Sequence, residues 1–306
     1  MRLYERILRL FPLASYEEER SRNGCMTFVR EEEAARPADG LTYSKRLYLR
    51  GNGAPVWVYI VTLSPDASAH WAVSAAPAGT ILQVREHARR FDGSVLFAMN
   101  AGFFHFFNNG DLTPYGIQIV RGEVCALPRV HDKPQHSTNF FAVTKEGLPL
   151  IADMDDYSEH LEGRLQYAVG GGLRLMIAGK IHLHSDESVA PRTVIGIAKD
   201  GTVIALCADG RSRISAGLSY ADLIDIYTHL GFEILELLNL DGGGSTAALL
   251  REENGSFRML NVPSGPPTPT ARAVEPHGEE QARPVADALL IVADSLYDAE
   301  CRFDSN

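Results

Sequence analysis

Hydrophobic and polar positions along the chain form short runs of the kind that predict β-strands. Residues 56–63, Val-Trp-Val-Tyr-Ile-Val-Thr-Leu, are β-branched and aromatic, which favours a strand. Similar runs, separated by glycine-containing turns, predict strands over residues 95–99, 116–120, 139–143, 149–152 and 286–292. Residues 194–198 and 202–207 flank Lys199-Asp200-Gly201, and an Asp-Gly pair between two apolar runs is a strong hairpin signal.

Two segments carry the period of an amphipathic helix. Ser219, with Asp222 three residues later, forms a capping box ahead of an apolar face. Thr80 and Gln83 have the same spacing and predict a second helix start. Many strands and two principal helices predict an α+β fold with mixed, largely antiparallel sheets.

The same pattern divides the chain into three parts. Residues 1–40 hold a short amphipathic pattern over residues 4–11 and then a polar stretch without a clear period, so we predict a lead-in segment. Residues 41–298 carry the strand and helix signals and are expected to form a single domain, with residues 299–306 as a C-terminal tail. Within that domain, the Pro- and Gly-rich residues 263–284 predict a long surface loop.

Composition narrows the class of protein. The 306 residues are 45% hydrophobic and 22% charged, which is an ordinary globular composition. A formal net charge of -10 argues against a general nucleic-acid binder, which needs a basic face. Charge interrupts the N-terminus, and no apolar run approaches the ~20 residues of a membrane span, so we expect no membrane span and a cytoplasmic location. The four cysteines lack C-x-x-C spacing, which argues against zinc or redox use.

The strongest candidate for chemistry is the stretch Asn239-Leu240-Asp241-Gly242-Gly243-Gly244-Ser245-Thr246. Three consecutive glycines between two apolar runs cost backbone entropy and therefore call for a reason. Either the loop needs positive φ angles, or a ligand approaches the main chain more closely than a Cβ would allow. Successive amides can form an anion-binding nest, with the aspartate beside it. A glycine-rich hairpin or bulge without a ligand is the alternative.

Similar polar or glycine-rich turns recur where other predicted strands end, and such ends can assemble a site. These turns contain Asn100 with Gly102, the triple glycine 170–172, Arg192 with Thr193, and Asp209-Gly210-Arg211-Ser212. The two arginines offer planar donor forks suited to phosphate or carboxylate. Asp209 and Asp241 are the carboxylates in these turns, and two carboxylates are the minimum for glycosyl transfer to water. An Arg192–Asp209 ion pair and a turn cap made by Asp241 are the structural alternatives.

Taken in order along the chain, these segments resemble the phosphodiester glycosidase family. The resembling segments are residues 100–104, 170–173, 191–196, 209–212, 217–219, 239–246 and 283–289. Two positions depart from the family pattern. Ala101 stands where the family usually has glycine, and Ala247 follows Ser245-Thr246 where the family usually has Ser-Ser-Thr. The second departure removes a hydroxyl from the turn and affects either substrate preference or one phosphate contact.

The resemblance implies a hydrolase that cleaves the glycosidic C–O bond of a sugar-1-phosphodiester, releasing the sugar and a phosphomonoester, with no required cofactor. The implied partner is a small-molecule or glycan sugar phosphate. The expected catalytic residues are Asp241, Asp209 and Arg192, with Asp241 favoured as nucleophile or water-activating base. The expected substrate- and phosphate-binding residues are Asn100, Gly102, Gly171, Arg211, Asn239, Gly242, Gly243, Gly244, Ser245 and Thr246. Because a phosphate leaves more readily than an alkoxide, a strong general acid is not needed.

Two other functions remain as alternatives. One is a binding module that holds a phosphorylated glycan without turnover, and the other is a metal-assisted phosphodiesterase that breaks the phosphorus–oxygen bond. His182 and His184 lie on one predicted strand face, but two ligands without a third usually mean surface histidines, so no metal site is predicted and a divalent metal remains an option. Arg283 precedes a proline and is interpreted as structural. The aromatic run near residues 103–107 is typical of core, although it could wall a sugar site.

Overall fold

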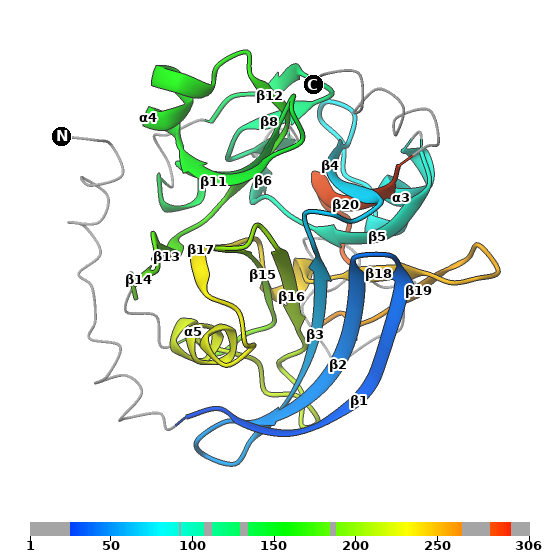
Figure 1. Cartoon of the computed structure of the whole chain (residues 1–306), viewed down its shortest axis with the longest axis vertical. Coiled ribbons are helices and arrows are strands. Elements are labelled where there is room, and N and C mark those ends of the chain that lie inside the picture. Colours follow the sequence, from blue (N-terminus) through cyan, green and yellow to red (C-terminus); the bar gives the residue numbers. More distant parts are fainter. Residues whose placement is uncertain are drawn as a thin grey trace.

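The protein, described here by a computed structural model, is built mainly of antiparallel sheets (Figure 1). The structure describes residues 25–91, 93–106, 112–128, 134–183, 188–264 and 282–294. Every strand pairing within these ranges is antiparallel, which confirms the predicted α+β fold with largely antiparallel sheets. The predicted helix over residues 4–11 and the C-terminal tail lie outside the described residues.

Three sheets and one small ribbon make up the architecture. The largest sheet contains, in spatial order, β1 (Thr27–Ala38), β2 (Leu41–Leu49), β3 (Pro55–Leu63), β16 (Val203–Ala208), β15 (Arg192–Ala198), β17 (Ile234–Asn239), β13 (Arg174–Ile177) and β14 (Lys180–Ile181). The second contains β11 (Pro149–Asp153), β10 (Asn139–Thr144), β12 (Leu165–Gly171), β8 (Gln118–Val120) and β9 (Glu123–Ala126). The third contains β19 (Phe257–Met259), β18 (Ala248–Arg251), β5 (Val95–Asn100), β20 (Asp287–Ala293) and β4 (Ala69–Ala75), and the ribbon pairs β6 (Phe104–Phe106) with β7 (Leu112–Pro114).

The helical elements are few and short. They are α3 (Val84–Arg90), α4 (Met154–Asp156), α5 (Tyr220–Thr228), the 3-10 turns η1 (Pro134–His136) and η3 (Gly243–Ser245), and the π-helical turn η2 (Tyr157–Leu161). Within the described residues, no helix combines the length and the apolar character that a membrane crossing requires.

The clearest predicted helix is confirmed. Ser219 is the N-cap of α5, and its side chain accepts a hydrogen bond from the backbone N–H of Asp222 while the Asp222 carboxylate accepts from the backbone N–H of Ser219. The other predicted start is wrong. Helix α3 begins after Gln83 as N-cap, because Leu82 still pairs with Val285 through two backbone hydrogen bonds of 2.8 and 3.0 Å.

The two faces of the eight-stranded sheet are covered differently. Helix α5 packs its apolar face, including Leu223 and Tyr227, on one side of this sheet. The opposite side shares a single core with the five-stranded sheets, in which Trp71, Phe141 and Leu238 from three different sheets are buried together. Figure 1 shows the two five-stranded sheets in the upper half of the view and α5 in the lower half, beside β15 and β16.

The polar stretch before residue 41 forms the long edge strand β1. Its residues pair with β2 in a register interrupted by three irregularities, and most of its side chains are exposed. An exposed edge strand needs no alternation of buried and polar positions, which explains why its sequence shows no clear period. The part of the predicted lead-in segment from Thr27 onward is therefore paired with the sheet of the main domain.

Candidate active site

The triple glycine lies where the end of β17 meets the end of β5, in a segment that we call the glycine loop (residues 241–246). Asn100, the last residue of β5, holds this loop in place and is completely buried. Its Nδ2 donates to the carbonyl of Asp241 at 2.6 Å, while its Oδ1 accepts from Thr193 Oγ1 at 2.9 Å and from the backbone N–H of Ala247 at 3.1 Å. Asn100 therefore positions the loop from within, and both of its side-chain polar atoms are already bonded to protein.

The glycines of this loop are required by a positive φ angle and by the close approach of other protein groups, whereas the approach of a ligand stays a prediction. Gly243 adopts φ 60°, and a Cβ there would lie 2.9 Å from Nη2 of Arg211. A Cβ on Gly242 would lie 2.7 Å from the carbonyl oxygen of Pro191. That same carbonyl accepts a hydrogen bond of 2.8 Å from the backbone N–H of Gly243, so this amide is used by the fold rather than offered to an anion.

Asp241 opens the glycine loop as a partly buried carboxylate. Its backbone N–H donates to the carbonyl of Ala101 at 2.8 Å, and its side chain accepts hydrogen bonds from the Ser245 hydroxyl and the Gly242 amide. Desolvation by the surrounding protein raises the pKa of Asp241 to about 7, against the lowering effect of the Ser245 hydrogen bond and the Arg283 charge. A carboxyl group that titrates near neutral pH can gain or lose a proton under working conditions.

Arg211 reaches over the glycine loop from outside it. Its backbone adopts φ 60°, a left-handed conformation that is uncommon for a residue other than glycine and that the surrounding structure must enforce. Desolvation and then the positive charges of Arg283 and Arg192 lower the pKa of Arg211. Arg283 and Arg192 are therefore each close enough to Arg211 for their charges to act on it, and an anion beside Arg211 would reduce that repulsion.

Arg283, which we interpreted from the sequence as structural, lies in this arginine cluster. Its Nη1 donates to the Ser245 hydroxyl at 3.5 Å, and its positive charge acts on Asp241. Its Nε is buried and has no hydrogen-bond partner within the described part of the chain. A buried guanidinium N–H without an acceptor is costly, and a phosphate oxygen is the kind of acceptor that would satisfy it.

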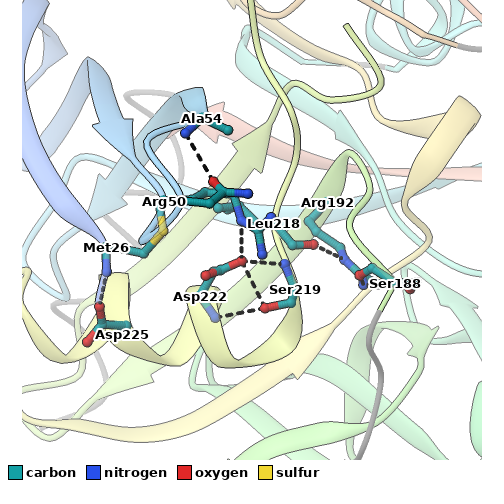
Figure 2. Close-up of polar contacts among 10 residues, drawn as sticks. Met26, Arg50, Ala54, Ser188, Arg192, Leu218, Ser219, Asp222 and Asp225 are labelled. Carbon is teal, nitrogen blue, oxygen red and sulfur yellow. Dashed lines mark hydrogen bonds and ion pairs between the residues drawn. The ribbon is translucent and has the colours of Figure 1, made fainter. Parts of the chain in front are cut away.

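Arg192 has a structural task in addition to its charge. Its Nη2 donates to the carbonyl and hydroxyl oxygens of Ser188 at 2.7 and 3.1 Å, and Figure 2 shows the two side chains together. Its Nε donates to the carbonyl of Leu218 at 2.9 Å, and its guanidinium lies 4.4 Å from the ring centroid of Tyr220. A direct contact of Arg192 with substrate stays a prediction.

The side chain of Asp209 is bonded by residues outside the glycine loop. Its Oδ2 accepts from the Tyr59 hydroxyl at 2.8 Å and its Oδ1 accepts from the backbone N–H of Val262 at 2.8 Å. Burial raises the pKa of Asp209 to about 6, partly offset by these hydrogen bonds. These contacts tie the end of β16 to β3 and to the segment after β19, which gives Asp209 a structural task, while its catalytic role stays a prediction.

The other predicted binding residues divide into two groups. Gly102 and Gly171 are packing positions, since a Cβ on Gly102 would lie 2.9 Å from the Asp287 carboxylate and a Cβ on Gly171 would lie 2.6 Å from the Leu238 side chain. Asn239 is only 2% exposed, and its Oδ1 has no hydrogen-bond partner. That orphan oxygen needs a donor such as a sugar hydroxyl.

The remaining loop residues face each other or the core. The Ser245 hydroxyl lies between Asp241 and Arg283, whereas the Thr246 hydroxyl accepts from Thr193 Oγ1 at 3.4 Å. Gly244 is buried between Gly243, whose backbone N–H donates to the carbonyl of Pro191, and Ser245, whose backbone N–H donates to the carbonyl of Gly242.

Across the described ranges, no three His, Cys, Asp or Glu side chains come together in a way that could hold a metal ion. His182 is described, while His184 lies outside those ranges. The need for a divalent metal therefore stays a question for experiment.

The fold is similar to the folds of several solved structures. The structure is similar to the catalytic domain of zebrafish N-acetylglucosamine-1-phosphodiester alpha-N-acetylglucosaminidase, auto-inhibited by its pro-peptide, with a TM-score of 0.58 and 18% identity over 92% of this chain and 94% of that one. A similar match to a hypothetical protein from Synechocystis (TM-score 0.55, 16% identity) covers 83% of this chain and 62% of that one. A putative exported protein from Burkholderia pseudomallei (TM-score 0.54, 14% identity) covers 78% and 74%.

The sequence then identifies the family. The phosphodiester glycosidase family matches residues 93–292, which is more than half of the 306 residues, and the chain belongs to that family. No curated protein sequence matches the chain. The matched region contains Asn100, Arg211, the glycine loop and Arg283, the residues that the structure brings together.

Proposed function

We propose that this protein hydrolyses a sugar-1-phosphodiester by cleaving the glycosidic C–O bond, releasing the sugar and a phosphomonoester. One observation carries the proposal: Asp241, with a pKa near 7, lies beside Arg283, and the charges of Arg192 and Arg283 act on Arg211 above the same loop. A titratable carboxylate next to an anion site is the combination that glycosyl transfer from phosphate to water requires.

The arginines act on the leaving group. As the C–O bond breaks, positive charge develops on the anomeric carbon and negative charge on the departing phosphate. The guanidinium groups of Arg211 and Arg283 stabilise that negative charge, and the phosphate satisfies the orphan Nε of Arg283. They are preorganised by the left-handed backbone of Arg211 and by the contact of Arg283 with Ser245, so they need little rearrangement during the reaction.

Asp241 acts on the sugar side in its ionised form. It either attacks the anomeric carbon or takes a proton from the attacking water, and the Ser245 and Gly242 hydrogen bonds stabilise its negative charge. The orphan Oδ1 of Asn239, two residues before it, accepts a hydroxyl of the same sugar. The sugar itself is unassigned, and N-acetylglucosamine is the first to test because the zebrafish relative is named for it.

The proposal is tested with a panel of α- and β-linked sugar-1-phosphodiesters, N-acetylglucosamine and glucose among them, assayed with and without chelator in ¹⁸O-labelled water. Cleavage of the C–O bond leaves the phosphomonoester unlabelled, which mass spectrometry detects directly. Label in the phosphate would reject the mechanism in favour of attack at phosphorus. Binding of the diesters without turnover would instead support a phospho-glycan binding module.

We expect Arg283→Lys to lower kcat/KM for the diester by roughly 100-fold. Lysine keeps the positive charge but cannot place two donors in one plane between Ser245 and a phosphate. Steady-state kinetics on the purified variant measure the effect. Arg258→Lys is the matched control, because Arg258 forms its fork with Glu33 on β1 instead. Equal losses in both variants would show that the effect comes from stability and not from the site.

A further inference from the structure

Asp287, the first residue of β20, is a buried carboxylate with no cationic partner among the described residues. It is only 1% exposed. Its Oδ1 accepts the backbone N–H of Gly102 at 2.6 Å and its Oδ2 accepts Nε2 of Gln118 at 2.5 Å, and both donors are neutral. An isolated charge in a protein interior costs several kcal/mol, so a position like this calls for a role beyond packing.

The segment of residues 100–102 joins Asp287 to Asp241. Asn100 Nδ2 donates to the Asp241 carbonyl, the carbonyl of Ala101 accepts the Asp241 backbone N–H, and the Gly102 backbone N–H donates to Asp287. Asn100 and Ala101 thus bond the backbone of Asp241, and Gly102, the next residue, bonds the side chain of Asp287. Gly102 fits tightly here, since a Cβ would lie 2.9 Å from Asp287 Oδ2 and 3.2 Å from the carbonyl oxygen of Gly170.

The two carboxylates also interact electrostatically. The negative charge of Asp287 raises the pKa of Asp241, while Arg283, Ser245 and the Gly242 amide act in the opposite direction. Burial raises the pKa of Asp287 itself to about 6, against the hydrogen bonds from Gln118 and Gly102. The charge of Asp287 therefore makes ionisation of Asp241 harder.

We infer that Asp287, rather than Asp209, is the second functional carboxylate of this site. It is a positioning residue that fixes the Asn100-Ala101-Gly102 segment carrying Asp241, and its charge sets how readily Asp241 gives up its proton. The expected effect on kcat/KM rests on the proposed function. A catalytic base works best with a pKa near the working pH, so a lower pKa of Asp241 would make it a weaker base. Asp209, bound by Tyr59 and Val262, has no corresponding link to residues 100–102.

The test is a titration of Asp241 in Asp287→Asn. The asparagine Oδ1 can still accept from Gly102, and the Gln118 carboxamide can turn to accept from the new Nδ2, so the charge is lost while the shape is kept. Carboxyl ¹³C NMR of aspartate-labelled protein follows Asp241, whose resonance is assigned by its absence in Asp241→Asn. We expect the Asp241 midpoint to fall by about one pH unit or less, and the pH profile of kcat/KM to move in the same direction.

Asp209→Asn is the matched control, because it removes an equally buried carboxylate that faces other residues. Its Asp241 midpoint is expected to match the wild type. An unchanged or higher midpoint in Asp287→Asn, or an equal shift in Asp209→Asn, overturns the inference. Should Asp287→Asn fail to fold, the amide resonance of Gly102 in the wild type serves instead, because it reports on the ionisation of Asp287. Its chemical shift must then also change over the pH range in which the Asp241 carboxyl titrates. None of these titrations needs turnover. A wild-type protein that cleaves no diester would therefore contradict the proposed function without affecting the test of Asp287.

Discussion

Replacement of Asp241 by asparagine is expected to lower kcat for a sugar-1-phosphodiester by about 1,000-fold or more. Asparagine has nearly the same shape, and its side chain can still accept from the Gly242 amide and bond the Ser245 hydroxyl, so the glycine loop keeps its anchors. What it loses is the ability to ionise, and with it the nucleophile or base. Phosphate affinity should stay the same or rise, because the arginines remain and one negative charge is removed.

The two effects are measured independently, turnover by release of free sugar and affinity by calorimetric titration with inorganic phosphate. Asp209→Asn provides the comparison, since Asp209 bonds Tyr59 and Val262 and not the glycine loop. Full turnover in Asp241→Asn would contradict the catalytic assignment. Loss of both turnover and phosphate binding would point to a structural effect of the substitution. A circular dichroism spectrum then shows whether the overall fold is retained.

Local sequence predicts the parts of this fold whose causes are local. The Asp200-Gly201 turn joins β15 and β16 as expected, with Gly201 at φ 87°, because only a few residues decide a tight hairpin. The α5 capping box forms for the same reason. The glycine loop was also recognisable, since three glycines beside an aspartate are unusual wherever they fold.

The second carboxylate of the site could not be recognised in this way. Asp287 begins an ordinary apolar strand, and its contact with Gly102 joins residues 185 positions apart. Asp209 looked equivalent to Asp241 because both stand in glycine-containing turns, yet its oxygens are bonded by Tyr59 and Val262. Which carboxylate faces the site depends on sheet packing, and that information is not present in either turn.

Arg283 and Asn100 show what local sequence leaves open about a site. Arg283 precedes a proline at the start of β20 and so looked structural, but the fold brings it to Ser245, 38 positions away. Asn100 is predicted to bind substrate, and in the fold its carboxamide bonds Asp241, Thr193 and Ala247, so its contact with substrate stays a prediction. Sequence indicated that these residues gather, whereas only the hydrogen bonds show which of them are left with capacity for a ligand.

The unusual ionisation of Asp241 also affects the stability of the fold. Its pKa in the folded protein is about 7, well above the value of about 3.9 expected in an unfolded chain. Below about pH 4 the Asp241 carboxyl group is protonated in both the folded and the unfolded state, and the stability that comes from its raised pKa is fully present. As the pH rises towards 7, the unfolded chain releases the proton while the folded protein retains it, so the free energy of unfolding falls. Asparagine cannot ionise and escapes this loss.

We therefore expect Asp241→Asn to be more stable than the wild type by on the order of 2 kcal/mol at pH 8 and by much less at pH 4. Urea unfolding at a series of pH values measures the difference. Asp209→Asn should show a difference of the same sign that levels off nearer pH 6, in line with the lower pKa of Asp209. A constant offset between Asp241→Asn and the wild type would mean that packing and not ionisation is responsible. Asp241→Asn is thus expected to lose the most activity and to gain stability. The burial that raises the pKa of Asp241 also makes its ionised form unfavourable in the folded protein.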